Sequence, residues 1–356
     1  MSGTSLDGID AALVDLSGGK PKLVGTHFQA YQPDLKDTLL ALHHPSLNEL
    51  HQAHITANSL AREYAVAIHS LLNNTGVAAG QVQAIGCHGQ TVRHRPEHGY
   101  TIQLNNAALL AELTGIHVVS DFRSRDIAAG GQGAPLVPAF HENVLRHPDV
   151  HRIILNIGGI ANLTDLPRNG ITTGFDTGPG NLLMDAWIAK HLNKPYDKDG
   201  TWAASGKIIP SLLKQLLAES FFIQSPPKST GRDLFNLAWL EKHLNENEAP
   251  ADVQATLLAL TCDSIANAVQ RFCNGSKEIY LCGGGAHNAA LVSRLQQALP
   301  QCLIQKTEAL GIEADWMEAI AFAWLAQQTM HLRPGNLPAV TGASHNCVLG
   351  AIYPGY

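Results

Sequence analysis

The stretch NIGGIANLTDL (residues 156–166) follows the apolar run RIIL, and the stretch GFDTGPGN (residues 174–181) begins eight positions after it ends. This pattern predicts a buried strand, a glycine turn, a second strand and a second glycine turn, with one acidic residue, Asp176, inside that second turn. Glycine has no Cβ, so its peptide groups can turn toward the oxygens of an anion. Residues 2–8 and 283–288 have the same character. Each turn alone is more often a simple connection, but three together make phosphate binding a reasonable hypothesis.

The bulk composition excludes several classes of protein. The chain has 356 residues, 45% of them hydrophobic, which suits two ordinary domains or one large one. No apolar run has the length of a membrane span and no secretory leader is visible, so we expect no membrane partner. The 24 basic residues do not cluster and the formal net charge is -6, which argues against a nucleic-acid partner. Six scattered cysteines without C-x-x-C spacing indicate free thiols and a cytoplasmic location, and no cysteine pair supports zinc.

Hydrophobic periodicity predicts alternating strands and helices, the pattern of an α/β fold. In the first third we expect a strand hairpin followed by helices and further strands, at residues 9–32, 47–72, 82–89, 101–104, 106–115 and 116–122. The glycine- and proline-rich segment 126–138 marks a domain joint or a substrate loop. A second round of strands opens at Arg152, and helices then dominate, the longest over residues 252–272. We therefore expect an N-terminal α/β domain over 1–145 and a C-terminal α/β domain with helical insertions over 146–356.

The glycine turns do not match the two commonest nucleotide-binding signatures. The chain contains no G-x-x-x-x-G-K-[ST] phosphate loop. It also lacks a G-x-G-x-x-G that opens a βαβ unit with an acidic residue at the right distance. Strand–turn–strand loops without an essential lysine are typical of another design, in which two related domains close around ATP.

Seven motifs together resemble one branch of the hexokinase, Hsp70 and actin superfamily, the anhydro-N-acetylmuramic acid kinases. They are MSGTSLDGID, GCHGQTVRH, DFRSRDIAAGGQGAPLVPAFH, NIGGIANLT, GFDTGPGN, PPKSTGRDLFN and CGGGAHN, and they cover the chain from residue 1 to about residue 345. The resemblance implies two ribonuclease-H-like α/β domains with an ATP cleft between them, and a homodimer. Members carry a strand's worth of residues before MSGTSLDG. We therefore expect the first strand of the N-terminal domain to be missing or shortened.

The resemblance also implies which residues bind ATP and its Mg²⁺. The first phosphate loop corresponds to Gly3, Thr4, Ser5, Leu6, Asp7, Gly8, Ile9 and Asp10. The second corresponds to Gly158, Gly159 and Asn162, and the adenosine loop to Gly283, Gly284 and Gly285. Asp7 is expected to help hold Mg²⁺ or to orient the sugar. Its alternative reading is the cap of an Asx turn.

Asp176 is the expected catalytic residue. Phosphoryl transfer needs positioning, charge neutralisation and a base for the nucleophile, and one carboxylate beside phosphate-binding turns suits the base. The family's sugar has a 1,6-anhydro bridge, so the resemblance implies that water attacks C1 while O6 takes the γ-phosphoryl group. Asp176 would activate this water, as the base of an inverting glycosidase does. The products would be N-acetylmuramic acid 6-phosphate and ADP, in peptidoglycan recycling.

Five further residues are candidates for the sugar side of the site. Glu318 could position the water, or it could be an ordinary helix-surface glutamate. Arg123 and Arg125 could meet the lactyl carboxylate of the sugar, or could pair with nearby aspartates. His88 and Gln90 could line the sugar pocket. The polar loop at Lys228–Arg232 has no role that the sequence reveals.

Three other functions remain open at this point. An ordinary sugar kinase of the same fold would also use Asp176 as its base, so only a substrate panel separates it. An ATPase of the superfamily would need no sugar, although a chaperone would need an extended peptide-binding domain. A glycosidase that uses Asp176 with a second carboxylate would need no nucleotide.

Overall fold

The computed structural model describes residues 1–3, 6–245 and 247–356, and it confirms the α/β class. The chain divides into two compact units, each described by itself below. Unit 1 comprises Met1–Val144 and Trp316–Tyr356, and unit 2 comprises Leu145–Asp315. The first boundary therefore lies next to the expected 145/146, but the last segment of the expected second domain belongs to unit 1. The physical reason is the apolar helix α13 (Met317–Met330), which packs on strands of unit 1.

Unit 2 is built on one five-stranded sheet with the strand order β11-β10-β7-β8-β9. Strands β7, β8 and β9 are antiparallel neighbours, whereas β10 and β11 run parallel to β7. This is the ribonuclease-H-like arrangement that the family resemblance implied for a domain. The strands are β7 (Arg152–Ile157), β8 (Ile160–Leu166), β9 (Thr173–Pro179), β10 (Glu278–Cys282) and β11 (Leu303–Lys306).

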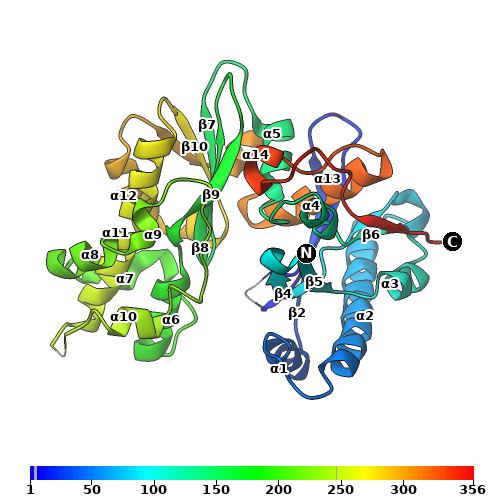
Figure 1. Ribbon diagram of the computed structural model, residues 1–356, viewed down its shortest axis with the longest axis horizontal. Helices are drawn as coiled ribbons and strands as arrows, with labels where there is room; N and C mark the ends of the chain where they lie inside the picture. Colours follow the sequence, from blue (N-terminus) through cyan, green and yellow to red (C-terminus); the bar gives the residue numbers. More distant parts are fainter. Residues whose placement is uncertain (4–5, 246) are drawn as a thin grey trace. The chain divides into compact units, whose positions relative to one another are not determined.

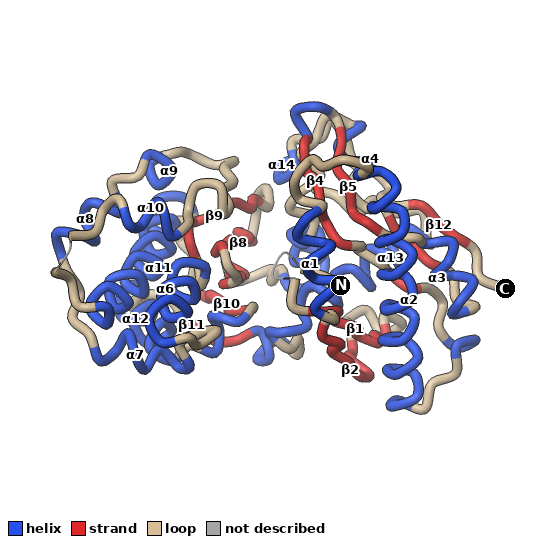
Figure 2. The backbone as a smooth tube through the Cα atoms, turned by 90° about the horizontal axis from the view of Figure 1, so that it is seen from below, coloured by secondary structure: helices blue, strands red, loops and turns tan. Residues whose placement is uncertain are grey.

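The core of unit 2 lies between this sheet and its helices. Ile153, Ile154 and Leu155 of the central strand are at most 1% exposed, and burying side chains of this size stabilises a fold by about 1.5–3 kcal/mol each. The long helix α11 starts with Pro250, a residue suited to the first helical turn, and packs on β9. Figure 2 shows the helices gathered on one side of the sheet. They are α6 (Leu182–Leu192), α7 (Thr201–Ser205), α8 (Pro210–Leu217), α9 (Ser220–Ile223), α10 (Leu237–Glu241), α11 (Pro250–Phe272) and α12 (Ala289–Ala298).

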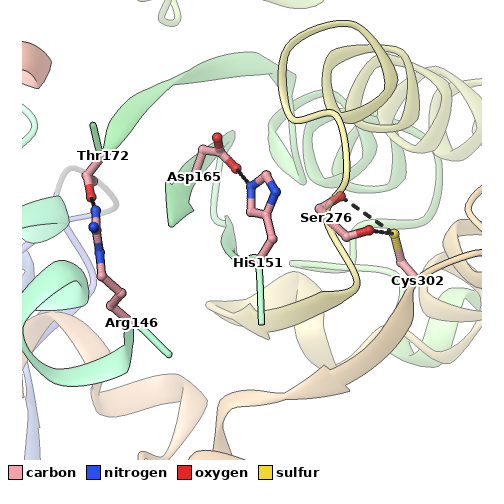
Figure 3. A network of polar contacts seen from close by, with 6 residues as sticks. All are labelled: Arg146, His151, Asp165, Thr172, Ser276 and Cys302. Atoms are coloured by element: carbon pink, nitrogen blue, oxygen red, sulfur yellow. Dashed lines mark hydrogen bonds and ion pairs between the residues drawn. The ribbon is translucent and has the colours of Figure 1, made fainter. Parts of the chain in front are cut away.

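A polar network fixes one end of this sheet (Figure 3). His151, just before β7, places Nε2 2.5 Å from Oδ1 of Asp165 on β8. The Arg146 side chain donates to the Thr172 hydroxyl just before β9. Ser276 and Cys302, before β10 and β11, are linked through the Cys302 thiol, 3.5 Å from the Ser276 carbonyl oxygen. The glycine turns lie at the opposite end of the sheet.

In the described residues of unit 1, the strands form three separate sheets. β1 pairs antiparallel with β2, β4 pairs antiparallel with β5, and β6 lies between β3 and β12. The hairpin predicted over residues 9–32 is confirmed by β1 and β2. The strands are β1 (Gly8–Asp15), β2 (Lys22–Ala30), β3 (Ile85–Gly86), β4 (Gln90–Arg95), β5 (Tyr100–Leu104), β6 (Val118–Ser120) and β12 (Ala351–Tyr353).

Capping residues mark the ends of helices α2 and α3 in unit 1. The long α2, blue in Figure 1, ends at Gly76 in a left-handed conformation, and α3 ends likewise at Gly115. The side chain of Asn106 caps α3 by accepting from the Leu109 N–H. The helices are α1 (Pro33–Ala41), α2 (Glu49–Thr75), α3 (Ala107–Thr114), α4 (Ser124–Ala128), α5 (Val137–Leu145), α13 and α14 (Pro338–Thr341).

Candidate functional site

Two glycine turns of unit 2 meet at one end of its sheet. The turn between β7 and β8 contains Gly158 and Gly159. The carbonyl oxygen of Gly158 accepts from the Asn181 N–H, and that of Gly159 accepts from the Gly180 N–H, both at 2.8 Å. The N-terminus of α6 therefore packs directly against this turn, and both segments present backbone to the same end of the sheet.

The turn after β10 packs beside them. Gly283 has φ +75°, and a Cβ there would lie 2.3 Å from Oδ1 of Asn156. A Cβ on Gly285 would lie 2.3 Å from a methyl carbon of Ile157. Both glycines are therefore required by the close packing of this turn against the end of β7.

Gly158, Gly159 and Gly284 differ, because the chain's own packing leaves room for a side chain. The nearest heavy atom to an added Cβ is 3.6 Å away at Gly158, 3.9 Å at Gly159 and 3.8 Å at Gly284. None of the three has a positive φ. Glycine at these positions leaves the turns open to an approaching ligand.

The prediction that Asp176 lies in a glycine turn is wrong, because it lies inside strand β9. Strand β9 extends through the glycine-rich segment because it pairs with β8, where Asn162 is the direct partner of Asp176. Directly paired residues of antiparallel strands have side chains on the same face. The Asn162 and Asp176 side chains are thus neighbours, and Asn162 lies on β8 three residues after Gly159.

A distant loop holds the Asp176 carboxylate. Oδ2 accepts hydrogen bonds from the Thr230 N–H at 2.9 Å and from the Ser229 hydroxyl at 3.2 Å. The Asp176 N–H donates to the Lys228 carbonyl oxygen at 3.1 Å. Burial raises the pKa of Asp176, while the hydrogen bonds from Thr230 and Ser229 and the charge of Lys228 act in the opposite direction. Oδ1 accepts no hydrogen bond from the described residues.

Aromatic rings fix the loop that reaches Asp176. The Lys228 ammonium lies 4.5 Å from the centroid of the Phe221 ring and 6.0 Å from that of Phe272, within reach of cation–π attraction. Its Nζ also donates to the Phe221 carbonyl oxygen at 3.2 Å. The hydroxyl oxygen of Thr230 is buried and has no partner among the described residues. The loop thus brings one unused polar atom close to the carboxylate.

Asp185 is a second carboxylate that the sequence did not single out. It lies on α6, one turn after Asn181. Burial, with a contribution from the negative charge of Asp197, raises the pKa of Asp185 to about 7, and Arg232 opposes this shift. Asp185 is therefore largely protonated on the acid side of neutrality.

The segment expected to form the first phosphate loop belongs to unit 1. Thr4 and Ser5, expected to contact ATP, lie outside the described residues. Gly3 and Leu6 flank them, and the side chain of the following residue, Asp7, is exposed. Leu6 has φ 55° and is only 3% exposed, so any contact it makes with a nucleotide would go through its backbone.

The rest of this loop enters β1. A Cβ on Gly8 would lie 2.3 Å from the Gln29 carbonyl oxygen, so glycine is needed here for strand pairing. The Ile9 side chain is 3% exposed and joins the hydrophobic core of unit 1. The Asp10 side chain is half-buried, and its charge acts on Glu318.

Arg123 and His88, two of the expected sugar-binding residues, are in contact. The Arg123 guanidinium donates to Nε2 of His88 at 2.8 Å and to the Gly133 carbonyl oxygen at 2.8 Å. Nδ1 of His88 lies 2.6 Å from the Gly89 carbonyl oxygen, which assigns the proton of a neutral ring to Nδ1. Burial and the charge of Arg123 hold the pKa of His88 well below its usual range.

Glu318 joins this cluster from the first turn of α13. Burial raises the pKa of Glu318, the charge of Arg123 lowers it, and Asp10 raises it further. Burial lowers the pKa of Arg123 to about 10, opposed by Glu318 and Asp126. The cluster therefore gathers Asp10, His88, Arg123 and Glu318 in unit 1.

Gln90 and Arg125 lie differently from the others. Gln90 is 0% exposed, donates to the Gly3 carbonyl oxygen at 3.1 Å and accepts from the Tyr31 hydroxyl at 3.4 Å. Its position suits holding the first phosphate loop. The Arg125 side chain is exposed on α4.

Within the described residues, no group of three or more histidine, cysteine, aspartate or glutamate side chains is arranged to hold a metal ion. In the same part of the chain, no helix combines the length and apolar character that crossing a membrane requires.

Comparisons with known proteins identify relatives over the whole chain. A family model described as anhydro-N-acetylmuramic acid kinase matches residues 1–355. The chain is 58% identical to the anhydro-N-acetylmuramic acid kinases of Nitrosospira multiformis and Nitrosomonas europaea, over 99% of this chain and 97% and 98% of theirs. Among solved structures, the activator of the 2-hydroxyisocaproyl-CoA dehydratase from Clostridium difficile with bound ADPNP aligns with a TM-score of 0.44 and 13% identity, over 91% of this chain and 98% of that chain.

Proposed function

Because the chain belongs to the anhydro-N-acetylmuramic acid kinase family, we propose that it uses ATP to open and phosphorylate 1,6-anhydro-N-acetylmuramic acid in peptidoglycan recycling. Water attacks C1, the bond between C1 and O6 breaks, and O6 takes the γ-phosphoryl group as its bond to ADP breaks. The products are N-acetylmuramic acid 6-phosphate and ADP. This makes the chain a phosphotransferase.

The observation that carries the proposal is the setting of Asp176. One carboxylate oxygen is held by the Thr230 N–H and the Ser229 hydroxyl. The other, Oδ1, can take the proton of the attacking water. Burial raises the pKa of Asp176, which strengthens its carboxylate as a base. No separate acid is needed, because the leaving O6 is capped by phosphoryl.

The glycine turns supply the phosphate-binding part of the proposal. Gly158, Gly159 and Gly284 leave their backbone open to a ligand. Gly3–Asp10, with Thr4 and Ser5 among them, would form the first phosphate loop. Gly283 and Gly285 shape the turn that would take adenosine.

Mg²⁺ fits the first loop by its chemistry. The Asp7 carboxylate is exposed, and carboxylate oxygen is the ligand that Mg²⁺ prefers. When bound, the ion neutralises charge on the phosphates, a task for which the glycine turns offer no lysine. Full turnover in EDTA would contradict this assignment.

In unit 1 the cluster of Asp10, His88, Arg123 and Glu318 is the candidate for binding the sugar. The Arg123 guanidinium can meet the lactyl carboxylate of the sugar, and neutral His88 keeps it oriented. Glu318 can position the water, and Arg125 can add positive charge from the surface. We further propose that the protein is cytoplasmic and forms a homodimer. Sedimentation of the purified chain would test the homodimer.

One experiment tests the reaction. The protein is incubated with the anhydro sugar and MgATP in ¹⁸O-water, and the product is analysed by mass. Label on the anomeric hydroxyl, with none in phosphate, is expected. Labelled inorganic phosphate with an intact anhydro bridge would leave only an ATPase, and phosphorylation of N-acetylmuramic acid at an equal rate would indicate an ordinary sugar kinase.

Asp176→Asn keeps the shape of the side chain and removes the base. Since general-base catalysis contributes about 10²–10⁴ in rate, kcat should fall by that factor while ATP affinity changes little. Near-normal turnover would place the base elsewhere, with Glu318 the next residue to change.

A further inference from the structure

Unit 2 contains a cavity of about 140 Å³ between strand β9 and the helices α8, α9 and α11. Thr177, the residue after Asp176 on β9, lines it. Lys228 and Arg271 also line it, and both carry positive charge. The proposed reaction uses neither of these two side chains. The cavity therefore brings unassigned charge next to the candidate catalytic carboxylate.

Lys228 supplies a buried ammonium group to this cavity. The residue is 9% exposed, and its Nζ donates to the Phe221 carbonyl oxygen at 3.2 Å, the only hydrogen bond of this group within the described residues. The centroids of the Phe221 and Phe272 rings lie 4.5 Å and 6.0 Å from Nζ. An ammonium group has three N–H donors, so two of them are available to another partner.

Arg271 adds a second cation from the last turn of α11. Its guanidinium carbon lies 4.9 Å from the centroid of the same Phe272 ring. Its N–H groups reach the carbonyl oxygens of Phe222 and Ile223 at 3.4 Å and 3.5 Å, which is longer than the usual hydrogen bond of about 2.7–3.2 Å. Among the described residues, neither Arg271 nor Lys228 forms an ion pair with a carboxylate.

The charges of these two residues act on each other and on Asp176. Burial lowers the pKa of Lys228, the charge of Arg271 lowers it further, and the charge of Asp176 raises it. The charge of Lys228 in turn opposes the rise that burial causes in the pKa of Asp176. Two positive charges and one negative charge leave one positive charge without a counter-ion. A single monovalent anion would balance it.

The rest of the cavity wall is mostly apolar. Its apolar residues are Leu217, Phe222, Ile223, Ala268 and Phe272. A phosphate ion suits these walls poorly, because it brings several strong acceptor oxygens and more than one negative charge near neutral pH. A carboxylate on a short hydrocarbon chain matches both the cations and the apolar wall. Since a cavity of about 150 Å³ holds benzene, the volume suits about six non-hydrogen atoms, the number in butyrate.

We propose that this cavity binds a short-chain monocarboxylate of about the size of butyrate, held between Lys228 and Arg271. The carboxylate accepts hydrogen bonds from the free N–H groups of the two cations, and the hydrocarbon chain contacts the apolar wall. The backbone of Lys228 accepts from the Asp176 N–H, so the bound anion lies close to the candidate base. Negative charge beside Lys228 offsets the support that this cation gives to the ionised form of Asp176.

Binding is measured by equilibrium dialysis of the full chain with radiolabelled butyrate at pH 8 and constant ionic strength. For about six non-hydrogen atoms we expect a Kd on the order of 1 mM. Acetate is two methylenes shorter and should compete about tenfold more weakly, whereas butyramide, which is neutral and has the same shape, should not compete. The proposal is overturned by equal competition from acetate or butyramide, by stronger competition from inorganic phosphate, by displacement with the anhydro sugar, or by no saturable binding at millimolar concentrations.

Two substitutions should change this Kd in opposite directions. Arg271→Gln keeps an exposed polar side chain but removes a charge, so butyrate should bind at least about fivefold more weakly. Asp176→Asn removes a nearby negative charge, so butyrate should bind more tightly. Lys242→Gln is the matched control, because Lys242 is exposed and lies outside the cavity. An equal loss in this control, or weaker binding by Asp176→Asn, would count decisively against the site.

The pH dependence of turnover gives a separate readout, which rests on the proposed function. If Asp176 is the base, saturating butyrate should move the acid limb of kcat/KM to higher pH and leave the alkaline plateau unchanged. An acid limb that does not move would overturn the coupling of the cavity to Asp176. The dialysis measurements need no turnover, so butyrate binding by a chain without kinase activity would support the site and refute the proposed function.

Discussion

Replacing Ser229 by alanine removes one hydrogen-bond donor from the Asp176 carboxylate. The remaining Thr230 N–H still holds Oδ2, so the loop should keep its place. Hydrogen bonds to charged groups stabilise by about 1.5–3 kcal/mol. Because Ser229 is exposed and its hydrogen bond is 3.2 Å long, we expect it to stabilise the Asp176 carboxylate by about 1 kcal/mol. That corresponds to about a fivefold change in an equilibrium constant.

The sign of the effect follows from the form that the hydroxyl stabilises. Ser229 lowers the pKa of Asp176 by stabilising the carboxylate, so its loss raises that pKa further. On the acid limb the ionised fraction, and with it kcat/KM, should fall about fivefold. On the alkaline plateau the variant should match the parent.

The assay is a pH profile of kcat/KM for the anhydro sugar at saturating MgATP. Ser225→Ala is the matched control, because Ser225 is an exposed serine before the same loop. A profile shifted to lower pH, or a uniform loss at all pH values, would refute the reasoning. An equal shift in the control would show that the loop as a whole had moved.

Three further predictions concern unit 2. Gly159→Ala should raise the KM for ATP with little change in melting temperature, because the chain leaves room for its Cβ. Gly285→Ala should destabilise the fold by about 1–3 kcal/mol, because its Cβ would lie 2.3 Å from a buried methyl carbon. A lower melting temperature for Gly159→Ala than for Gly285→Ala would contradict this division of the glycines. Burial raises the pKa of Asp185 to about 7, so the folded state holds a proton that the unfolded state releases near pH 4. The free energy of unfolding should therefore decrease as the pH rises from about 4 to about 7. Asp185→Asn should therefore melt higher than the parent at pH 8 and equally at pH 4, and an equal melting temperature at pH 8 would refute this. His151→Ala should lower the free energy of unfolding, measured by urea denaturation, by about 1–3 kcal/mol, because buried Asp165 loses its hydrogen bond to His151. An unchanged midpoint of the urea transition would show that solvent replaces the histidine.

Local pattern predicted the α/β class and some of the elements, among them the β1–β2 hairpin. It did not predict β4, nor the helices α4 and α5 that overlap the glycine- and proline-rich segment 126–138. Local pattern failed at Asp176, where glycine density indicated a turn. The strand is set instead by pairing with Asn162 on β8, which a count of turn-forming residues does not reveal.

The partners of the site residues could not be predicted, because they depend on long-range packing. Ser229 and Thr230 reach Asp176 across more than fifty residues, and nothing near Asp176 indicates them. The resemblance suggested Arg123 and His88 separately, but only the fold shows that they touch. The place of helix α13 on β1 rests on contacts between the two ends of the chain, which local pattern does not reveal.

The division of the chain has a consequence for its synthesis. Unit 2 is one continuous segment, Leu145–Asp315, whereas unit 1 needs both ends of the chain. As the polypeptide leaves the ribosome, unit 2 is therefore the first to be complete, although its sequence comes second. At about 5–20 residues per second, the segment from Trp316 to Tyr356 takes a further few seconds. During that interval β1 lacks the cover of α13, and the nascent N-terminal half would be the part exposed to chaperones and proteases.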